Sequence, residues 1–248
     1  MRTLEIPTKP TIYVSDIHGD ISSLEKIKSL PEYNNPNYQV VFGGDYIDGE
    51  PYGLEVLKFV YTEVLKENRY ATMGNHEKLL LSFLDAPYGV DKANYYGNGG
   101  KHTLKHMCGD LGYSAIKMAS MVKRRYPELV AFLRNLPICV ESDNQMFVHA
   151  GVDPVLSDYH ETKNDDALWI RDDYINFPNT TGKVVVSGHT PTFLVNGHPS
   201  CPIEVLGGDP KRYLIDGGEH AMNRHLNVLI LNADGSFQKK YVISGENG

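Results

Sequence analysis

Three apolar stretches, each ending in a polar motif, constrain the fold more than any other feature of the sequence. Residues 11–15, 38–43 and 69–73 are rich in β-branched and aromatic residues, which is typical of buried strands. The segments between and after them space their apolar residues as a helix does, for example at Leu54 and Leu57. The first half of the chain therefore predicts alternating strands and helices, and hence an α/β fold with a parallel sheet.

Candidate functional residues lie where these strands end. The motifs are Asp16-Ile17-His18-Gly19, Gly44-Asp45-Tyr46-Ile47-Asp48-Gly49 and Gly74-Asn75-His76-Glu77. Asp16 and His18 are expected to face the same way, because alternate residues of an extended chain do. Since the carboxyl ends of parallel strands meet at one edge of a sheet, the three motifs are expected to converge there.

The second half of the chain is rich in predicted strands. They fall near residues 137–141, 145–149, 183–187, 211–215, 226–232 and 236–243. By composition, residues 86–100 are expected to form a loop, residues 101–134 to be helical, and residues 152–182 to be irregular. We expect a second sheet packed on the first and, without a repeat or linker, one domain over residues 1–248.

Charge and cysteine content exclude several classes of protein. The net charge is −7 and there is no lysine- or arginine-rich tract, so neither nucleic-acid nor membrane binding is expected. No apolar run is long enough to span a bilayer, and no apolar signal segment follows Met1. Cys108, Cys139 and Cys201 are odd in number and widely spaced, which predicts reduced thiols in a cytoplasmic protein.

Two later motifs complete a set of metal ligands. His149-Ala150-Gly151 and Gly188-His189-Thr190-Pro191 add imidazoles to the carboxylates and amide of the first half. Mixed nitrogen and oxygen ligands suit manganese, iron or zinc better than calcium or magnesium. Asp45 is the natural bridge between two divalent ions, since a carboxylate can present one oxygen to each. Asp16 and His18 complete one predicted site; Asn75, His149 and His189 complete the other.

Each of these residues also has a structural interpretation when it is taken alone. A single aspartate after a strand commonly caps a helix, and a single histidine beside glycine commonly makes a partly buried hydrogen bond. Trp169 is expected to be a core or packing residue. The five motifs together nevertheless indicate a dinuclear metal centre, because independent structural roles do not explain their occurrence in one chain.

The ordered motifs resemble those of the calcineurin-like metallophosphoesterases, especially the bacterial and phage serine/threonine phosphoprotein phosphatases. The resemblance runs from about residue 11 to residue 232. Lesser matches are Asn98-Gly99-Gly100, Leu168-Trp169-Ile170-Arg171 and Tyr213-Leu214-Ile215-Asp216-Gly217-Gly218. The resemblance implies a four-layer α/β/β/α sandwich with two mixed sheets and two divalent metals, Mn²⁺ foremost, with iron or zinc as alternatives.

The resemblance also implies roles for individual residues. Asp16, His18 and Asp45 would hold one ion, and Asp45, Asn75, His149 and His189 the other, with a bridging hydroxide attacking phosphorus. His76 would protonate the leaving oxygen, and Asp48 would hydrogen-bond the other ring nitrogen of His76. Arg171 would bind the phosphate oxygens, with Asn98 as a further substrate-binding residue.

Two departures from the family pattern concern arginine. Gly49, followed by Glu50, stands where family phosphatases usually have an arginine, and Met73 stands where bacterial and phage members often have another. Among the usual phosphate-binding arginines, Arg171 alone has a clear match. Asn98, Lys78 or Lys101 are candidates to compensate, and no purpose is assigned to Glu50.

Three functions are consistent with these residues. The first is a phosphatase acting on phosphoserine or phosphothreonine in a protein, or on small phosphomonoesters. The second is a hydrolase of diadenosine tetraphosphate or related nucleotides, and the third is a catalytically weak, metal-stabilised scaffold that binds a partner. The presence of Asp48 favours the first, because symmetrical dinucleotide hydrolases resemble G-D-L-V-A-R-G at that point and lack this aspartate. The physiological substrate, the native metal and the oligomeric state stay open.

Overall fold

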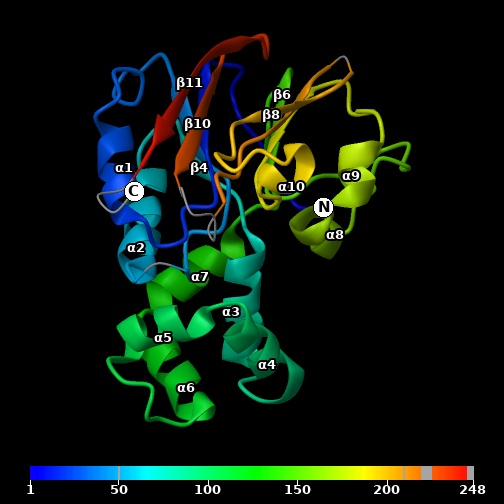
Figure 1. The fold of residues 1–248 in the computed structure, drawn as a ribbon. Helices are drawn as coiled ribbons and strands as arrows, with labels where there is room; N and C mark the ends of the chain where they lie inside the picture. The colour runs from blue at the N-terminus through cyan, green and yellow to red at the C-terminus, as the bar shows by residue number, and fades with distance from the viewer. Residues whose placement is uncertain (50, 209, 219–224, 245–248) are drawn as a thin grey trace.

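Two mixed β-sheets packed face to face form the centre of the molecule (Figure 1). The computed structural model describes residues 1–49, 51–208, 210–218 and 225–244. The five-stranded sheet has the order β11 (Phe237–Ile243), β10 (Leu226–Leu231), β2 (Thr11–Val14), β3 (Gln39–Phe42) and β4 (Arg69–Ala71). The six-stranded sheet has the order β1 (Thr3–Glu5), β5 (Cys139–Glu141), β6 (Gln145–Val148), β7 (Val184–Ser187), β9 (Arg212–Leu214) and β8 (Glu204–Leu206).

The strands that lead to the candidate site are parallel. β2, β3 and β4 run parallel in the first sheet, and β6, β7 and β9 run parallel in the second. Apolar side chains from both sheets fill the space between them, and the rings of Tyr13 and Phe147 stack at 5.3 Å. Ile12 and Val14 point to the opposite face of β2, as the alternation of a strand requires.

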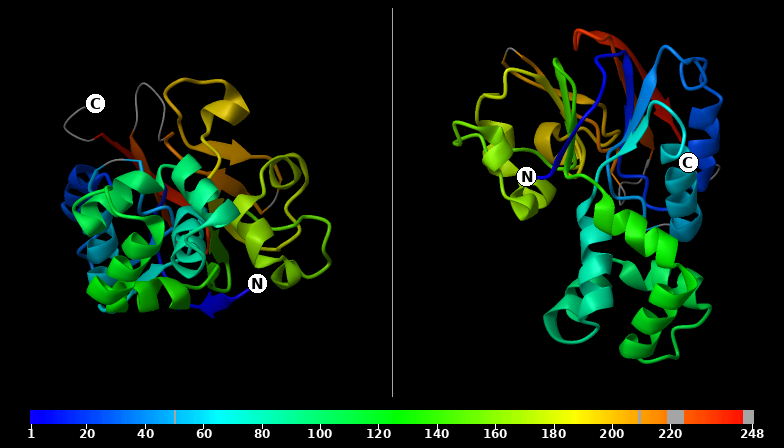
Figure 2. Two further views of the ribbon diagram at one scale, coloured as in Figure 1. Left: turned by 90° about the horizontal axis from the view of Figure 1, so that it is seen from below. Right: turned by 180° about the vertical axis from the view of Figure 1, so that it is seen from behind.

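Helices cover the outer face of each sheet (Figures 1 and 2). α1 (Ile21–Lys28) and α2 (Gly53–Val64) lie beside the five-stranded sheet. α8 (Asn164–Trp169), α9 (Asp172–Asn176) and α10 (Phe193–Asn196) lie beside the six-stranded sheet. This arrangement confirms the predicted sandwich. Within the described residues, no helix combines the length and apolar character needed to cross a bilayer.

A helical unit extends from one end of the sheets (Figure 2, right). It consists of α3 (Asn75–Asp85), α4 (Gly89–Gly97), α5 (Gly100–Cys108), α6 (Ala115–Arg125) and α7 (Pro127–Asn135). The prediction of a loop over residues 86–100 is therefore wrong. Tyr95 is fully buried, with its ring 5.3 Å from that of Phe83, so packing overrides the Gly- and Asn-rich composition.

Other predicted elements need smaller corrections. Residues 101–134 form parts of three helices, because Gly109 ends α5 in a left-handed conformation and Pro127 begins α7. The stretch 152–182 contains α8, α9 and a 3₁₀ turn over Tyr159–Glu161. β10 and β11 join the first sheet, since β10 pairs antiparallel with β2, and not the second as their position in the chain suggested.

Candidate metal centre

The candidate ligands come together at the carboxyl ends of the parallel strands, as the α/β pattern predicts. Asp16 and His18 follow β2, Asp45 follows β3, Asn75 opens α3 after β4, His149 follows β6, and His189 follows β7. All six are buried. A cavity of about 330 Å³ opens onto five of them, and His149 lies fully buried beneath.

The Asp45 carboxylate is the centre of the arrangement. Its Oδ2 lies 3.3 Å from His149 Nε2, 3.6 Å from His18 Nε2 and 3.9 Å from His76 Nε2. Two groups of potential ligands share this residue: His18, Asp45 and His76 form one, and Asp45, His149 and His189 form the other. Burial opposes the charge of Asp45, but His149 and His76 hold its pKa well below the usual value.

The chemistry of the second group fits a cation. Asn75 Oδ1 lies 2.8 Å from His149 Nε2 and 3.1 Å from His189 Nδ1. His149 Nδ1 lies 2.9 Å from the Gly43 carbonyl oxygen, so it donates there and leaves Nε2 as the nitrogen that faces Asn75 and Asp45. His149 Nε2 thus faces two acceptor oxygens, one from Asn75 and one from Asp45. A nitrogen lone pair would repel both oxygens, so this arrangement requires a shared proton or a metal ion between them.

Asp16 lies beside the first group, and its carboxylate is hydrogen-bonded on two sides. The Asp16 carboxylate accepts hydrogen bonds from the Ser15 hydroxyl and, at 2.9 Å, from the backbone N–H of His189. Burial raises the pKa of Asp16 to about 6, against the opposing charge of His149. The His76 ring, the predicted proton donor, lies close to His18 and Asp45 in this group.

Backbone strain is concentrated at these residues. Among the described residues, seven that are not glycine have positive φ, and five of them are predicted site residues: Asp16, His18, Asp45, Asp48 and His189. Such conformations cost free energy and persist where the surrounding structure enforces them, commonly at functional sites. The strain arises because the backbone turns sharply in the loops that follow the strands.

His76 and Asp48 form the pair that the family resemblance implies. His76 Nδ1 lies 2.9 Å from Asp48 Oδ2, and the Asp48 side chain is fully buried. The other carboxylate oxygen of Asp48 accepts hydrogen bonds from Thr103 Oγ1 at 2.6 Å and Tyr95 OH at 3.3 Å. Burial raises the pKa of Asp48, while its hydrogen bond with His76 opposes that shift.

Sequence reasoning assigned no role to Glu77. Its fully buried carboxylate accepts hydrogen bonds from the backbone N–H groups of Asp45 and Tyr46, both at 2.8 Å, and of Gly74 at 3.0 Å. Glu77 thus holds the Asp45 loop against the start of α3. Its place three residues after Gly74 was a usable signal, since an acidic side chain there reaches back to backbone N–H groups.

The predicted substrate-binding residues line the same cavity. Arg171 and Asn98 both line it, and Arg171 is the one arginine or lysine to do so within the described chain. Trp169 also lines it, which corrects its assignment to the core. The indole is 40% exposed and meets the His189 ring edge-on at 5.6 Å. Asp216, quoted only as part of a lesser match, is a further lining residue.

The departures from the arginine pattern have local explanations. Gly49 adopts φ 72°, a left-handed conformation that glycine takes without strain and arginine does not. Met73 is buried and faces a different cavity, as does Lys78. Lys101 lies over the Tyr96 ring at 5.3 Å. Glu50 lies outside the described residues.

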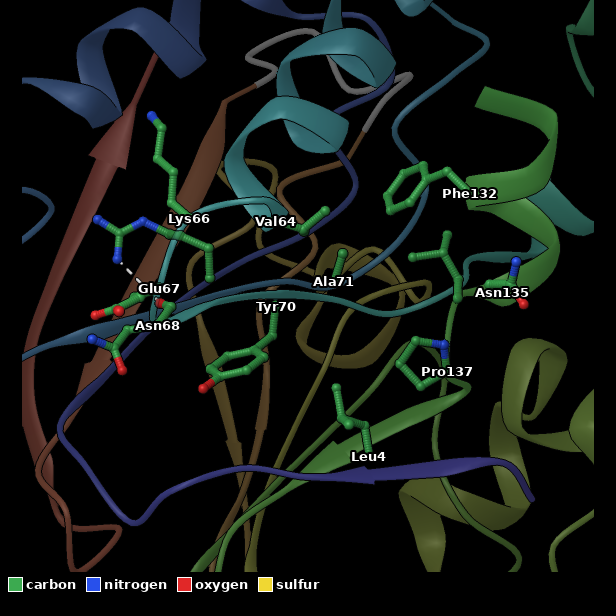
Figure 3. Close-up of a pocket in the computed structure, with 12 residues that line it drawn as sticks. Leu4, Val64, Lys66, Glu67, Asn68, Tyr70, Ala71, Phe132, Asn135 and Pro137 are labelled. Carbon is green, nitrogen blue, oxygen red and sulfur yellow. Dashed lines mark hydrogen bonds between the residues drawn. The ribbon is translucent and has the colours of Figure 1, made fainter. Parts of the chain in front are cut away.

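A second cavity of about 520 Å³ lies apart from the metal ligands (Figure 3). It is bounded by the end of α2, the edge strand β4, α7 and β1, with Val64, Tyr70, Phe132 and Pro137 among its lining residues. It shares no residue with the metal-lined cavity, and its two basic lining residues, Lys66 and Arg69, both pair with Glu63. The candidate chemistry therefore belongs to the smaller cavity.

Comparison with known proteins identifies relatives of two named activities. The chain is similar to serine/threonine-protein phosphatase 7 of Arabidopsis thaliana, with 31% identity over 46% of this chain and 27% of that protein. It is similar to the symmetrical bis(5'-nucleosyl)-tetraphosphatase of Actinobacillus succinogenes, with 27% identity over 58% of this chain and 45% of that protein. The chain thus spans less than half the length of either relative.

The fold has a counterpart among solved structures. A crystal structure described as that of a candidate diadenosine tetraphosphatase superposes with a TM-score of 0.67 at 17% identity, covering 100% of this chain and 99% of the other. The family model for calcineurin-like phosphoesterases matches residues 9–222, which include every strand end that carries a candidate ligand. On this match the chain belongs to the calcineurin-like phosphoesterase family.

Proposed function

We propose that the chain is a phosphoesterase that depends on two divalent metal ions and acts on phosphomonoesters. One observation carries the proposal: Asp45 Oδ2 lies between the imidazoles of His18 and His149, with the His76–Asp48 pair directly beside it. That geometry supports two cation sites and a proton donor at one cavity. Hydrolysis of a phosphate ester uses cations to neutralise charge on the phosphoryl group and a proton donor for the leaving oxygen.

The proposed ligands divide between the two halves of the cavity. Asp16, His18 and Asp45 would hold one ion, and Asp45, Asn75, His149 and His189 would hold the other. Bound there, the ions would supply positive charge that polarises the phosphoryl group and makes a water easier to deprotonate. We propose Mn²⁺ for both positions, with iron or zinc as alternatives, because the ligands mix imidazole nitrogen with carboxylate and amide oxygen.

The chain's own side chains then move the proton and hold the phosphate. Water adds to phosphorus and releases one proton to solvent while the bond to the leaving oxygen breaks, and the Nε2 proton of His76 passes to that oxygen. His76 regains a proton from solvent, so ester and water give alcohol and phosphate. Asp48 accepts a hydrogen bond from His76 Nδ1 and so keeps the imidazole oriented with Nε2 toward the cavity. Arg171 binds two phosphate oxygens through its planar guanidinium group, and Asn98 adds a weaker contact.

Two features support a phosphate on an alcohol, such as phosphoserine or phosphothreonine, over a dinucleoside polyphosphate. An alkoxide is a poor leaving group and needs a proton, which the His76–Asp48 pair supplies, whereas a departing nucleotide phosphate is a stable anion without one. A polyphosphate chain carries several negative charges, and Arg171 is the one arginine or lysine that lines the cavity within the described residues.

The names of relatives support each substrate class. The Arabidopsis relative is a serine/threonine-protein phosphatase, and the Actinobacillus relative is a symmetrical bis(5'-nucleosyl)-tetraphosphatase. Dinucleoside polyphosphate hydrolysis is therefore the second candidate function, and substrate comparison separates the two.

The test is side-by-side turnover by Mn²⁺-loaded protein of a phosphoserine peptide, p-nitrophenyl phosphate and diadenosine tetraphosphate. We expect hydrolysis of the first two and a much lower kcat/KM for the third. His76→Asn should lose at least about 100-fold in kcat while keeping both ions, since general acids contribute on that scale. Preference for diadenosine tetraphosphate would establish the second candidate, and no turnover with Mn²⁺, iron or zinc would overturn both.

A further inference from the structure

The buried carboxylate of Asp48 is held on its far side by two residues from the helical unit. Thr103 Oγ1 donates to Asp48 Oδ1 at 2.6 Å and accepts the Asp48 backbone N–H at 2.9 Å. Tyr95 OH donates to the same Oδ1 at 3.3 Å. Asp48 Oδ2 is left to face His76 Nδ1 at 2.9 Å, so the two oxygens have separate partners.

Both holding residues are themselves fixed. Tyr95 is fully buried in α4, and its ring packs on Phe83 of α3, the helix that carries His76 near its start. A Cβ at Gly100 would lie 2.4 Å from the Tyr95 ring, so the helix that carries Thr103 approaches α4 as closely as glycine permits. Thr103 is 1% exposed. Neither hydroxyl can reorient toward solvent.

We propose that Thr103 and Tyr95 are positioning residues for the proton donor. They anchor one oxygen of Asp48 so that the other stays aligned with His76 Nδ1, and His76 Nε2 stays directed at the leaving oxygen. The inference rests on the proposed function, because it assigns the helical unit a part in the proton transfer of that reaction. It also explains why residues 47 and 55 positions away from Asp48 in sequence contact it.

A positioning role predicts a loss that depends on the leaving group. Thr103→Val keeps the shape of the side chain and removes the hydroxyl, so Asp48 loses a donor to Oδ1 and an acceptor for its N–H. We expect kcat for phenyl phosphate, whose leaving group is poor, to fall about tenfold. A general acid accelerates a reaction by about 10²–10⁴-fold, and misaligning it should lose only a part of that acceleration. For p-nitrophenyl phosphate, whose leaving group departs readily, the fall should stay below about threefold.

Two further variants serve as controls. Thr103→Ser restores the hydroxyl and should restore phenyl phosphate turnover to within about twofold of the original protein. Tyr95→Phe removes the longer, weaker hydrogen bond and should lower phenyl phosphate turnover by about threefold. Thr103→Ser removes one buried methyl group and Tyr95→Phe removes only the hydroxyl, so together they keep the proposal testable if Thr103→Val folds poorly.

The experiment measures kcat and KM for both esters with full-length Mn²⁺-loaded protein, metal stoichiometry by calorimetry, and the crystal structure of Thr103→Val. Support is a kcat loss confined to phenyl phosphate, unchanged KM and two bound ions, with the Asp48 carboxylate rotated away from His76 Nδ1. Equal losses on both esters, no loss, no rescue by serine, or an unchanged Asp48–His76 contact would overturn the proposal. If the original protein hydrolyses neither ester, the proposed function fails instead, and the structure of the variant still decides whether Thr103 orients Asp48.

Discussion

The two walls of the metal-lined cavity differ in how firmly their side chains are held. On the wall formed by the ends of β2, β3, β6 and β7 and the start of α3, Asp45 and Asp48 are each fixed by hydrogen bonds from several directions. On the wall from α8 and α10, Trp169 and Leu194 are 40% and 61% exposed. There, Arg171 Nη1 has no hydrogen-bond partner among the described residues.

The difference separates chemistry from binding. Groups that act in a transition state gain from being held in place before the substrate arrives. Groups that bind substrate gain from leaving their polar atoms unpaired and their apolar surface open until the substrate fills the site. We infer that the first wall carries the metal ions and the proton donor, and that the second wall contacts the substrate.

The largest expected effect lies on the first wall, at the shared carboxylate. Asp45→Asn keeps the shape of the side chain but removes the charge that faces His18, His76 and His149. We expect the affinity for both metal ions and kcat to fall by more than about 100-fold, beyond the usual cost of losing a residue that only supports a ligand. Calorimetric titration with Mn²⁺ measures the first loss, and two ions bound at the original affinity would remove Asp45 from the bridging position.

A change on the second wall should spare metal binding. Arg171→Lys keeps the charge but loses the planar pair of donors, so kcat/KM should fall by about 10- to 100-fold, the scale of a charge-assisted hydrogen bond. The matched control is Arg124→Lys on the exposed face of α6, which should leave kcat/KM unchanged. If Arg171→Lys lowered metal affinity as strongly as Asp45→Asn, the division between the walls would be wrong.

The smallest expected effect lies away from both walls, in the 3₁₀ turn at Tyr159–Glu161. His160 lies between two carboxylates, with Nδ1 2.8 Å from Asp158 Oδ1 and Nε2 2.9 Å from Glu141 Oε1. The hydrogen bond with Glu141 raises the pKa of His160. A raised pKa in the folded state stabilises the protein fully below the unfolded value of about 6.5, and this stabilisation is lost as pH rises through the folded value.

We therefore expect His160→Gln to lower the free energy of unfolding by about 0.5–1 kcal/mol at pH 5.5, the scale of a partly exposed ion pair. The difference should shrink as the pH rises above neutrality. Urea unfolding of both proteins across this range measures it. A difference that stays constant across this pH range would show that His160 acts through packing and not through its charge.

Much of the fold and the candidate ligands could be predicted because the signals are local. The strands at residues 11–14, 39–42 and 69–71 follow from short apolar runs, and the rule that parallel strands end at one edge brings their motifs together. The α4 helix, the exposure of Trp169 and the pairing of β10 with β2 depend on contacts between distant segments. No window of sequence contains those contacts.

The same reasoning explains what was missed within the site. Thr103 and Tyr95 reach Asp48 only because α3, α4 and α5 pack together, and the composition of residues 86–100 conceals that packing. Glu77 stood inside a recognised motif, yet its hydrogen bonds to the Asp45 loop appear only when β3 and α3 lie side by side. Residue types and their order suggest which groups act, and tertiary contacts determine which groups hold them.

Anomalous diffraction from crystals of Mn²⁺-loaded protein tests the central claim most directly. We predict two manganese peaks about 3.5–4 Å apart, one on each side of Asp45 Oδ2, with His18 beside one and Asn75, His149 and His189 beside the other. A single peak, or peaks that Asp45 does not touch, would contradict the shared-carboxylate centre on which the proposed function depends.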